Sequence, residues 1–323
     1  MPPNFSQGWK CLWMADAPFD GWVLCDTATA DPHLVNSLDA TTLAHLQTWQ
    51  GKTETRHDLI SVAPVRSMSA TLDREDAEPH NGDTLPPLWH WLYFLPVARQ
   101  SDIGPDGHPK RGGFLPPVPL PRRMWAGGRL HWHQPMRLGE EVQRVSSIEK
   151  VQHKIGRSGE LLFVQVLHRY SNPHGVCLEE THDIVFRPNA DPAATPLPGV
   201  KSVHTAVWQR DIVPDEVLLF RYSALTFNSH RIHYDRRYVT QVEGYPGLIV
   251  HGPLMATWMV ELLRQHSPRA LQSFEFKAVK PVFESADQRL LSICAHPDGE
   301  QVHVWVQDHH GDVCMQATAR WAT

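Results

Sequence analysis

Hydrophobic and polar positions follow two patterns along this chain, and the patterns occur in the same order in each half. Apolar residues at helical spacing over residues 34–49, with Asp39 as the N-cap, predict a first helix. Residues 87–96 predict another helix that ends at Pro96. From residue 122 onwards polar and apolar residues alternate, interrupted by "GRSG" and "NPHG". This alternation predicts three or four antiparallel strands joined by hairpins.

The second half repeats the order of helices followed by strands. Residues 214–226 and 235–244 predict two helices, the second closed by Gly244. Residues 253–267 form the strongest helix pattern, with Pro253 suited to the first turn and an apolar face made of Met255, Trp258, Met259 and Leu262. The remaining residues predict a meander of strands. The repeated order predicts an α+β fold with an internal duplication of architecture.

Two stretches have no periodicity. Residues 100–121, "QSDIGPDGHPKRGGFLPPVPLP", are dense in Gly and Pro and predict an extended surface loop or lid. Residues 189–202 are rich in Pro and Ala and predict a linker. The linker divides the chain into an N-terminal domain of residues 1–188 and a C-terminal domain of residues 203–323.

Composition narrows the class of protein. With 323 residues, of which 41% are hydrophobic and 20% charged, the chain is predicted to be globular with two domains. A formal net charge of -5 leaves no basic surplus for phosphates, so nucleic acid is not an expected partner. Five scattered cysteines without a C-x-x-C pair suit a reducing cytosol. Neither a signal peptide nor an apolar run of ~20 residues is evident, which predicts a cytoplasmic protein without membrane contact.

The stretch "TFNSHRIHYD", residues 226–235, is the first candidate for chemistry. It could be a loop that moves protons, a metal site, or a polar turn rich in histidine. Near pH 7 the neutral imidazole of His233 can take a proton from water, and the carboxamide of Asn228 can hold that water by hydrogen bonds. A solvated loop between two helices is the alternative interpretation.

The stretch "GYPGLIVHGPLMA", residues 244–256, adds a second element. Gly247, Gly252 and Pro253 lead into the strongest predicted helix. Backbone N–H groups near Gly252 therefore lie at a helix N-terminus, where a developing oxyanion is stabilised. A glycine-rich helix start that serves packing alone is the competing interpretation.

Metal and cofactor chemistry find little support. His230, His233 and His251 could bind a metal, but no H-x-E or H-E-x-x-H signature accompanies them. No G-x-G-x-x-G, Walker A or G-x-S-x-G motif is present. The sequence therefore predicts neither a metal nor a separate cofactor.

"YSALTFNSHRIHYD" followed by "EGYPGLIVHGPLMA" resembles the active-site signature of the MaoC-like hydratases and dehydratases. The resemblance is closest to the branch of 3-hydroxyacyl-thioester dehydratase type 2 and mesaconyl-CoA (itaconyl-CoA) hydratases, and "LPRRMWAGGRLHWHQPMRLGEEV" (120–142) is similar to the N-terminal half of that branch. The resemblance implies a double hotdog, with each antiparallel sheet wrapped around a long helix. It also implies reversible addition of water to an α,β-unsaturated acyl-CoA, with CoA as part of the substrate.

The resemblance also implies roles for residues. His233 matches the catalytic histidine and Gly252 the oxyanion-hole glycine, while Asn228 stands where the broader family has a catalytic aspartate. The pattern D-x-N-P-x-H becomes N-S-H-R-I-H here, and asparagine cannot donate or accept a full proton. The N-terminal half has no matching loop and is expected to be a non-catalytic partner.

The substrate is expected to be a short, branched acyl-CoA with a free carboxylate, which needs a cation in the pocket. The candidate cations are Arg231, Arg122, Arg123 and Arg129. The full set of expected substrate-binding residues is Arg231, Tyr234, Gly247, His251 and Arg129. Straight-chain acyl thioesters, a catalytically inactive acyl-thioester-binding hotdog and a metal-dependent hydrolase are the alternatives, and a homodimer is a possible assembly.

Overall fold

A computed structural model describes residues 38–156, 159–189, 198–284 and 290–322. The interpretations of residues 1–37 and of most of the 189–202 linker lie outside this range. The division into domains at the linker therefore stays a prediction. Among the described residues, no helix combines the length and apolarity needed to cross a membrane.

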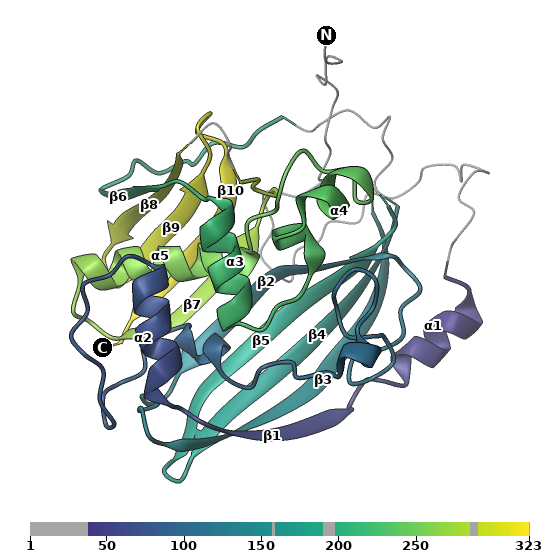
Figure 1. Cartoon of the computed structure of the whole chain (residues 1–323), viewed down its shortest axis with the longest axis horizontal. Coiled ribbons are helices and arrows are strands. Elements are labelled where there is room, and N and C mark those ends of the chain that lie inside the picture. The colour runs from purple at the N-terminus through teal and green to yellow at the C-terminus, as the bar shows by residue number, and fades with distance from the viewer. Residues whose placement is uncertain (1–37, 157–158, 190–197, 285–289, 323) are drawn as a thin grey trace.

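The strands form one ten-stranded sheet in which all neighbours are antiparallel, shown as a continuous curved surface in Figure 1. The strand order is β1-β3-β4-β5-β2-β7-β10-β9-β8-β6. The strands are β1 Thr53–Leu59, β2 Arg122–Trp132, β3 Glu141–Gly156, β4 Gly159–Asn172, β5 Gly175–Arg187, β6 Trp208–Ile212, β7 Leu271–Ala278, β8 Leu291–Asp298, β9 Gln301–Gln307 and β10 Val313–Trp321. Four strands in residues 122–187 and four in residues 271–321 confirm the predicted strands of both halves, but β2 pairs with β5 and β7 pairs with β10, so only β3 to β5 and β8 to β10 form meanders.

The two halves of the sheet meet where β2 pairs with β7. Gly128 lies at this seam, and a Cβ atom there would approach the Phe276 ring to 2.8 Å. A side chain would therefore push the two strands' inner faces apart. The second glycine of "MWAGG" thus has a packing role where the halves join.

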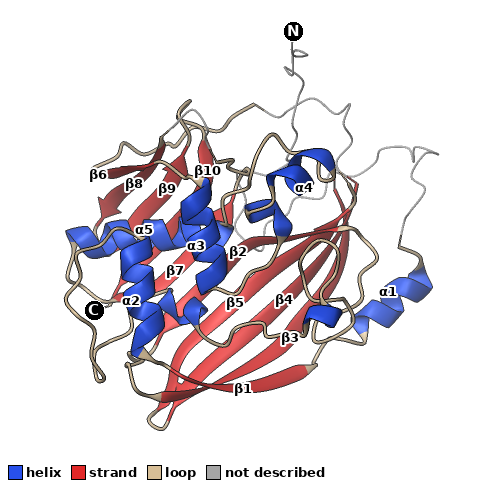
Figure 2. Ribbon diagram, viewed as in Figure 1, coloured by secondary structure: helices blue, strands red, loops and turns tan. Residues whose placement is uncertain are grey.

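The helices are α1 Ala40–Gln47, α2 Val62–Thr71, α3 Glu216–Leu225, α4 Arg236–Gln241 and α5 Gly252–His266. Asp39 caps α1 by accepting a hydrogen bond from the Thr42 N–H, as predicted. Figure 2 shows helices gathered over the C-terminal half, whereas mainly loops cross the N-terminal strands. The α+β class is therefore observed, with unequal helix content in the two halves.

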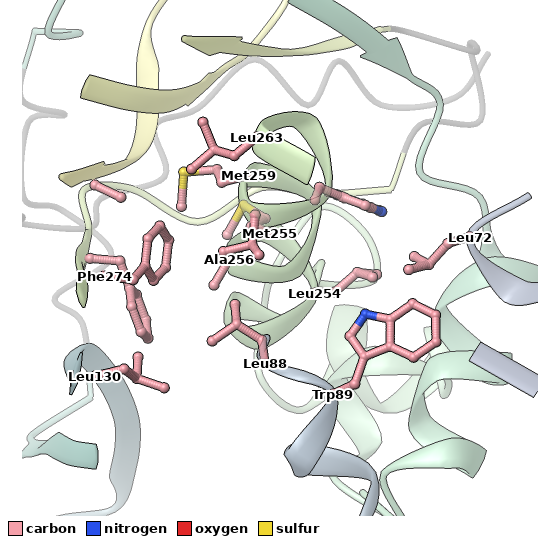
Figure 3. Packing of buried hydrophobic residues seen from close by; sticks show 14 of the residues in the cluster. Leu72, Leu88, Trp89, Leu130, Leu254, Met255, Ala256, Met259, Leu263 and Phe274 are labelled. Atoms are coloured by element: carbon pink, nitrogen blue, oxygen red, sulfur yellow. The ribbon is translucent and has the colours of Figure 1, made fainter. Parts of the chain in front are cut away.

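Helix α5 is the centre of the core. Every residue from Leu254 to Leu263 is buried, so the helix is enclosed on all sides and not only along the predicted apolar face. Figure 3 shows side chains of α5 between Phe274 and Leu130 of the sheet and Leu88 and Trp89 of the N-terminal half. The core is thus shared by the two halves.

The prediction of a helix over residues 87–96 is wrong. Only one 3₁₀ turn forms, Trp89–Leu92, between Leu88 and Phe94, which both have positive φ. The indole N–H groups of Trp89 and Trp91 donate to the buried carboxylates of Glu261 and Glu180. These tertiary hydrogen bonds determine the local conformation in place of helix propensity. Strand β1, strand β6 and helix α2 were not predicted from the pattern.

Candidate functional site

The loop between α3 and α4 holds the first candidate residues in a defined shape. After α3 the backbone turns back at Phe227, and the Asn228 N–H donates to the Ser223 carbonyl at 2.8 Å. The Asn228 Oδ1 accepts from the His230 N–H at 3.0 Å. This bond identifies Oδ1 as the acceptor, so the Nδ2 amide remains a donor, and no described residue accepts from it. The loop can therefore offer a fixed hydrogen-bond donor.

His233 lies at the end of this loop in the 3₁₀ turn Arg231–His233 and is buried. Its Nδ1 is 2.7 Å from the Ile249 carbonyl oxygen, which can only accept, so Nδ1 carries the hydrogen. Nε2 is then an unprotonated acceptor, and no described residue donates to it. Burial lowers the pKa of the imidazole to about 4, so it is neutral near pH 7. This arrangement is suited to a general base.

His251 supports the ring of His233. The two rings stack with their centroids 3.7 Å apart and an interplanar angle of 18°. His251 is fully buried, and its Nε2 is 2.8 Å from the Ser223 hydroxyl. Its predicted contact with substrate stays untested, but the geometry is that of a residue that orients His233.

Gly252 is the first residue of α5, so its N–H has no acceptor in a preceding helical turn. A Cβ atom here would meet only Met315, at an ordinary 3.8 Å, among the described residues. Packing within the chain therefore does not require the glycine, which leaves room for a ligand near a helix N-terminus. Gly247 differs, because a Cβ there would lie 2.9 Å from Glu284 Oε1, so packing offers a reason for this glycine, and its predicted contact with substrate stays untested.

Residues 100–121 do not form a free surface lid, because one segment is bound to the loop between α3 and α4. The Arg231 N–H donates to the Asp106 carbonyl at 2.9 Å, and the Ser229 hydroxyl donates to the Gly107 carbonyl. A Cβ at Gly107, whose φ is +92°, would lie 1.8 Å from the Ser229 carbonyl oxygen. The N-terminal half thus reaches the candidate site directly.

The arginine candidates differ in their partners. Arg231 forms an ion pair with Asp235 at 2.7 Å and stacks over Tyr238. Arg122 donates to the Tyr245 hydroxyl and the Glu243 carbonyl. The charge of Arg231 is therefore already balanced within the protein.

The structure does not bring Arg129 to the site. Arg129 forms an ion pair with Asp183, and it follows a β-bulge between Trp125 and Gly127. Its neighbour Leu130 is in the core, so Arg129 points to the opposite face of the sheet. Tyr234 is 41% exposed and donates to the Ser229 carbonyl, and its predicted role stays untested.

Arg123 is the arginine that the geometry favours. It interacts electrostatically with Asp106, His108 and His230, yet it forms no hydrogen bond or ion pair with any described residue. Burial lowers the pKa of its guanidinium to about 10, and Asp106 acts in the opposite sense. Five N–H donors of a partly buried cation are therefore available to an anion.

The sequence did not predict Asp106 and His108 as site residues. With His230 they place one donor atom each within 4.8 Å of one another, a group that could hold a metal. The metal trio considered from the sequence, His230, His233 and His251, is not among the groups of described residues whose donor atoms lie within 4.8 Å of one another. The acidic and imidazole side chains of "PDGHP" were the available signal.

Comparisons with known proteins agree with this geometry. The sequence profile of the hydroxyacyl-thioester dehydratase type 2 family matches residues 88–284. The chain is 46% identical over 271 residues to the mesaconyl-C(4)-CoA hydratase of Chloroflexus aurantiacus, covering 84% of this chain and 95% of that protein.

Two solved structures are similar in fold. A MaoC-like dehydratase from Phytophthora capsici has a TM-score of 0.64 at 11% identity, covering 87% of this chain and 99% of the other. A Mycobacterium tuberculosis protein described as a double hotdog has a TM-score of 0.53 at 11% identity, covering 84% and 96%. The predicted α+β double hotdog is confirmed. The expected long helix in each half is not: among the described residues α5 has 15 residues, whereas α1 and α2 of the N-terminal half have 8 and 10.

Proposed function

Because this chain belongs to the hydroxyacyl-thioester dehydratase type 2 family, a MaoC-like group of hydro-lyases, we propose that it adds water reversibly to a short α,β-unsaturated acyl-CoA carrying a free carboxylate. Hydration of an enoyl-CoA-type substrate follows from the family and from the relative that is 46% identical. A mesaconyl-type or itaconyl-type acyl group is the finer proposal. CoA belongs to the substrate, and no separate cofactor is proposed.

In this mechanism the residues of the C-terminal half handle the water. The Nε2 lone pair of His233 takes a proton from water, while the Nδ2 amide of Asn228 holds the water oxygen. The water oxygen bonds to the β-carbon, and the thioester carbonyl becomes an enolate beside the Gly252 N–H. General-base assistance contributes about 10²–10⁴-fold in rate, and one oxyanion donor contributes about 3–4 kcal/mol.

The observation that supports a carboxylated substrate is Arg123. A carboxylate in a partly buried pocket is costly unless a cation meets it with hydrogen bonds. Arg123 interacts with His108 and His230 and has unused donors, whereas Arg122, Arg129 and Arg231 have partners. A substrate carboxylate beside Arg123 would complete these hydrogen bonds.

A panel of enoyl-CoAs tests the proposal, with loss of enoyl-thioester absorbance as the measurement. Mesaconyl-type or itaconyl-type CoA should show a higher kcat/KM than crotonyl-CoA. Arg123→Leu should lower kcat/KM for the carboxylated substrate by about 10- to 100-fold, because a charged hydrogen bond is worth about 1.5–3 kcal/mol, and should spare crotonyl-CoA. Arg129→Leu, on the other face of the sheet, is the matched control.

Other outcomes have distinct meanings. Faster hydration of straight-chain enoyl-CoAs would make the enzyme a fatty acyl-thioester dehydratase. Binding without turnover of any enoyl-CoA would indicate an acyl-thioester-binding protein, and thioester cleavage dependent on metal would indicate a hydrolase. The cytoplasmic location and the homodimer stay predictions.

A further inference from the structure

Asp106 and His108 come from the N-terminal half, but the chain holds them against the loop between α3 and α4. The carbonyl oxygens of Pro105, Asp106 and Gly107 all accept hydrogen bonds from residues 229–231. The steric limit at Gly107 fixes the approach of the two segments. These hydrogen bonds and the close approach at Gly107 hold Asp106 and His108 in a fixed position at the site.

The geometry within the pair is that of an oriented imidazole. His108 Nδ1 is 2.9 Å from Asp106 Oδ2, which leaves Nε2 without a described hydrogen-bond partner. The side chains are partly exposed, 21% for His108 and 35% for Asp106, so a ligand can reach them. The His108 ring lies 3.9 Å from that of His230, and His230 lies 5.5 Å from His233. A carboxylate that orients an imidazole is the arrangement that activates histidine in many enzymes.

Hydration needs two proton transfers, one from water and one to the α-carbon. Asn228 can make neither transfer, and the Nδ1 of His233 is bonded to a backbone carbonyl in place of a carboxylate. We infer that Asp106 and His108 form the second acid–base unit of the site, with His108 exchanging a proton with the α-carbon and Asp106 positioning His108. This inference rests on the proposed hydratase function. It departs from the expectation that the N-terminal half takes no part in catalysis.

The steps balance without any further reactant. His233 takes a proton from water as the water oxygen bonds to the β-carbon, and the C=C electron pair moves to form the enolate. The α-carbon of the enolate then takes the proton from Nε2 of the His108 imidazolium, whose Nδ1–H stays bonded to Asp106. The site ends with the proton on His233 in place of His108, and exchange with solvent restores the starting state.

The charges around His108 favour an acid–base pair over a metal site. Arg123 of β2 and Arg111 of the same loop place positive charge near His108, and Arg123 also lies near Asp106 and His230; this charge opposes a divalent metal ion more strongly than the single charge of an imidazolium, whose formation it also opposes. Burial acts to raise the pKa of Asp106, but the hydrogen bonds from His108 and the charges of His108 and Arg123 together outweigh it and lower that pKa to about 2. The carboxylate is therefore ionised and able to stabilise an imidazolium on His108. Burial, with Arg123 and Arg111, lowers the pKa of His108 although Asp106 opposes the shift, so the neutral imidazole predominates near pH 7 and the imidazolium that donates the proton is the minor form.

Three variants test the inference by hydration of the preferred enoyl-CoA: His108→Gln, Asp106→Asn and, as the matched control on the same loop, Asp102→Asn, whose side chain is exposed. His108→Gln should lower kcat by about 10²–10⁴-fold with little change in KM. Asp106→Asn should move the alkaline limb of the rate profile to lower pH, because the imidazolium loses its carboxylate. Thermal melting confirms folding, and the isosteric Asp106→Asn variant serves if His108→Gln does not fold.

A carboxylate introduced at position 228 gives an independent test. Adding Asn228→Asp to His108→Gln should recover part of the lost kcat, since a carboxylate at position 228 can move a proton. No recovery in a folded double variant would overturn the inference. So would a wild-type kcat in His108→Gln, a wild-type rate that stays level on the alkaline side, or one metal ion per chain in purified enzyme. Absence of hydration by the wild type would instead overturn the proposed function together with this inference.

Discussion

The two halves share one sheet, but their interiors are filled differently. In the C-terminal half the apolar helix α5 lies against the sheet, and its N-terminus supplies Gly252 to the site. In the N-terminal half a single 3₁₀ turn, Trp89–Leu92, is held by the buried carboxylate of Glu180. A long helix holds its first N–H groups at a fixed place. The short turn is instead followed by a loop, and residues 105–107 of this loop reach the C-terminal half, where they accept hydrogen bonds from residues 229–231.

A substitution of Glu180 measures how far the interior of the N-terminal half depends on a buried carboxylate. The fully buried carboxylate is within hydrogen-bond distance of four side chains: His90, Trp91, Tyr170 and His182. Burial acts to raise its pKa, but His182 and His90 outweigh this and hold the pKa well below its usual range. Glu180→Ala should lower the free energy of unfolding by about 3–5 kcal/mol, because it leaves buried donors unpaired.

Chemical denaturation measures this effect, and the adjacent residue is the control. Glu179 points to the other face and pairs with the exposed Arg169. Glu179→Ala should therefore change the unfolding free energy by about 0–1 kcal/mol. Equal losses in the two variants would show that the buried carboxylate is not the support of the N-terminal interior.

Substitutions of Asn228 test whether the loop between α3 and α4 supplies a hydrogen-bond donor to the reaction. Asn228→Leu removes both the bond to the His230 N–H and the free Nδ2 donor, and should lower kcat by about 10- to 100-fold because the water loses its orientation. Asn228→Asp should keep measurable hydration, since a carboxylate can still accept from the His230 N–H. A leucine variant as active as wild type would make Asn228 a structural residue only.

Stability is also expected to depend gradually on pH. Burial lowers the pKa of His233 to about 4 and also lowers those of His168 and His251. The unfolded chain therefore takes up protons before the folded one, so stability should fall as pH drops from about 6.5 towards about 4. Melting temperatures across this range measure it. An unchanged melting temperature down to pH 5 would contradict neutral buried histidines.

The sequence predicted those features that depend on residues close together in the chain. Helix α5, the two meanders, and the loop with Asn228 and His233 follow from local periodicity and motif. The pair Asp106 and His108 could not be found in this way, because it lies in a loop without periodicity more than a hundred residues before its partners in the site.

The prediction that Arg129 lies at the site was wrong for a different reason. The β-bulge between Trp125 and Gly127 shifts the alternation of β2 by one residue. Arg123 and Leu130 therefore share the inner face, and Arg129 lies on the outer one. A strict period of two would have placed Arg123 and Arg129 together.

The kcat of His233→Ala tests the central claim most directly, that the histidine of the C-terminal loop is the base for water addition. Measured with the preferred enoyl-CoA, the variant should lose about 10²–10⁴-fold in kcat. Its melting temperature should fall moderately, because the imidazole is buried and stacks on His251, but a cooperative melting transition should remain. A folded variant that hydrates the substrate at the wild-type rate would contradict the account.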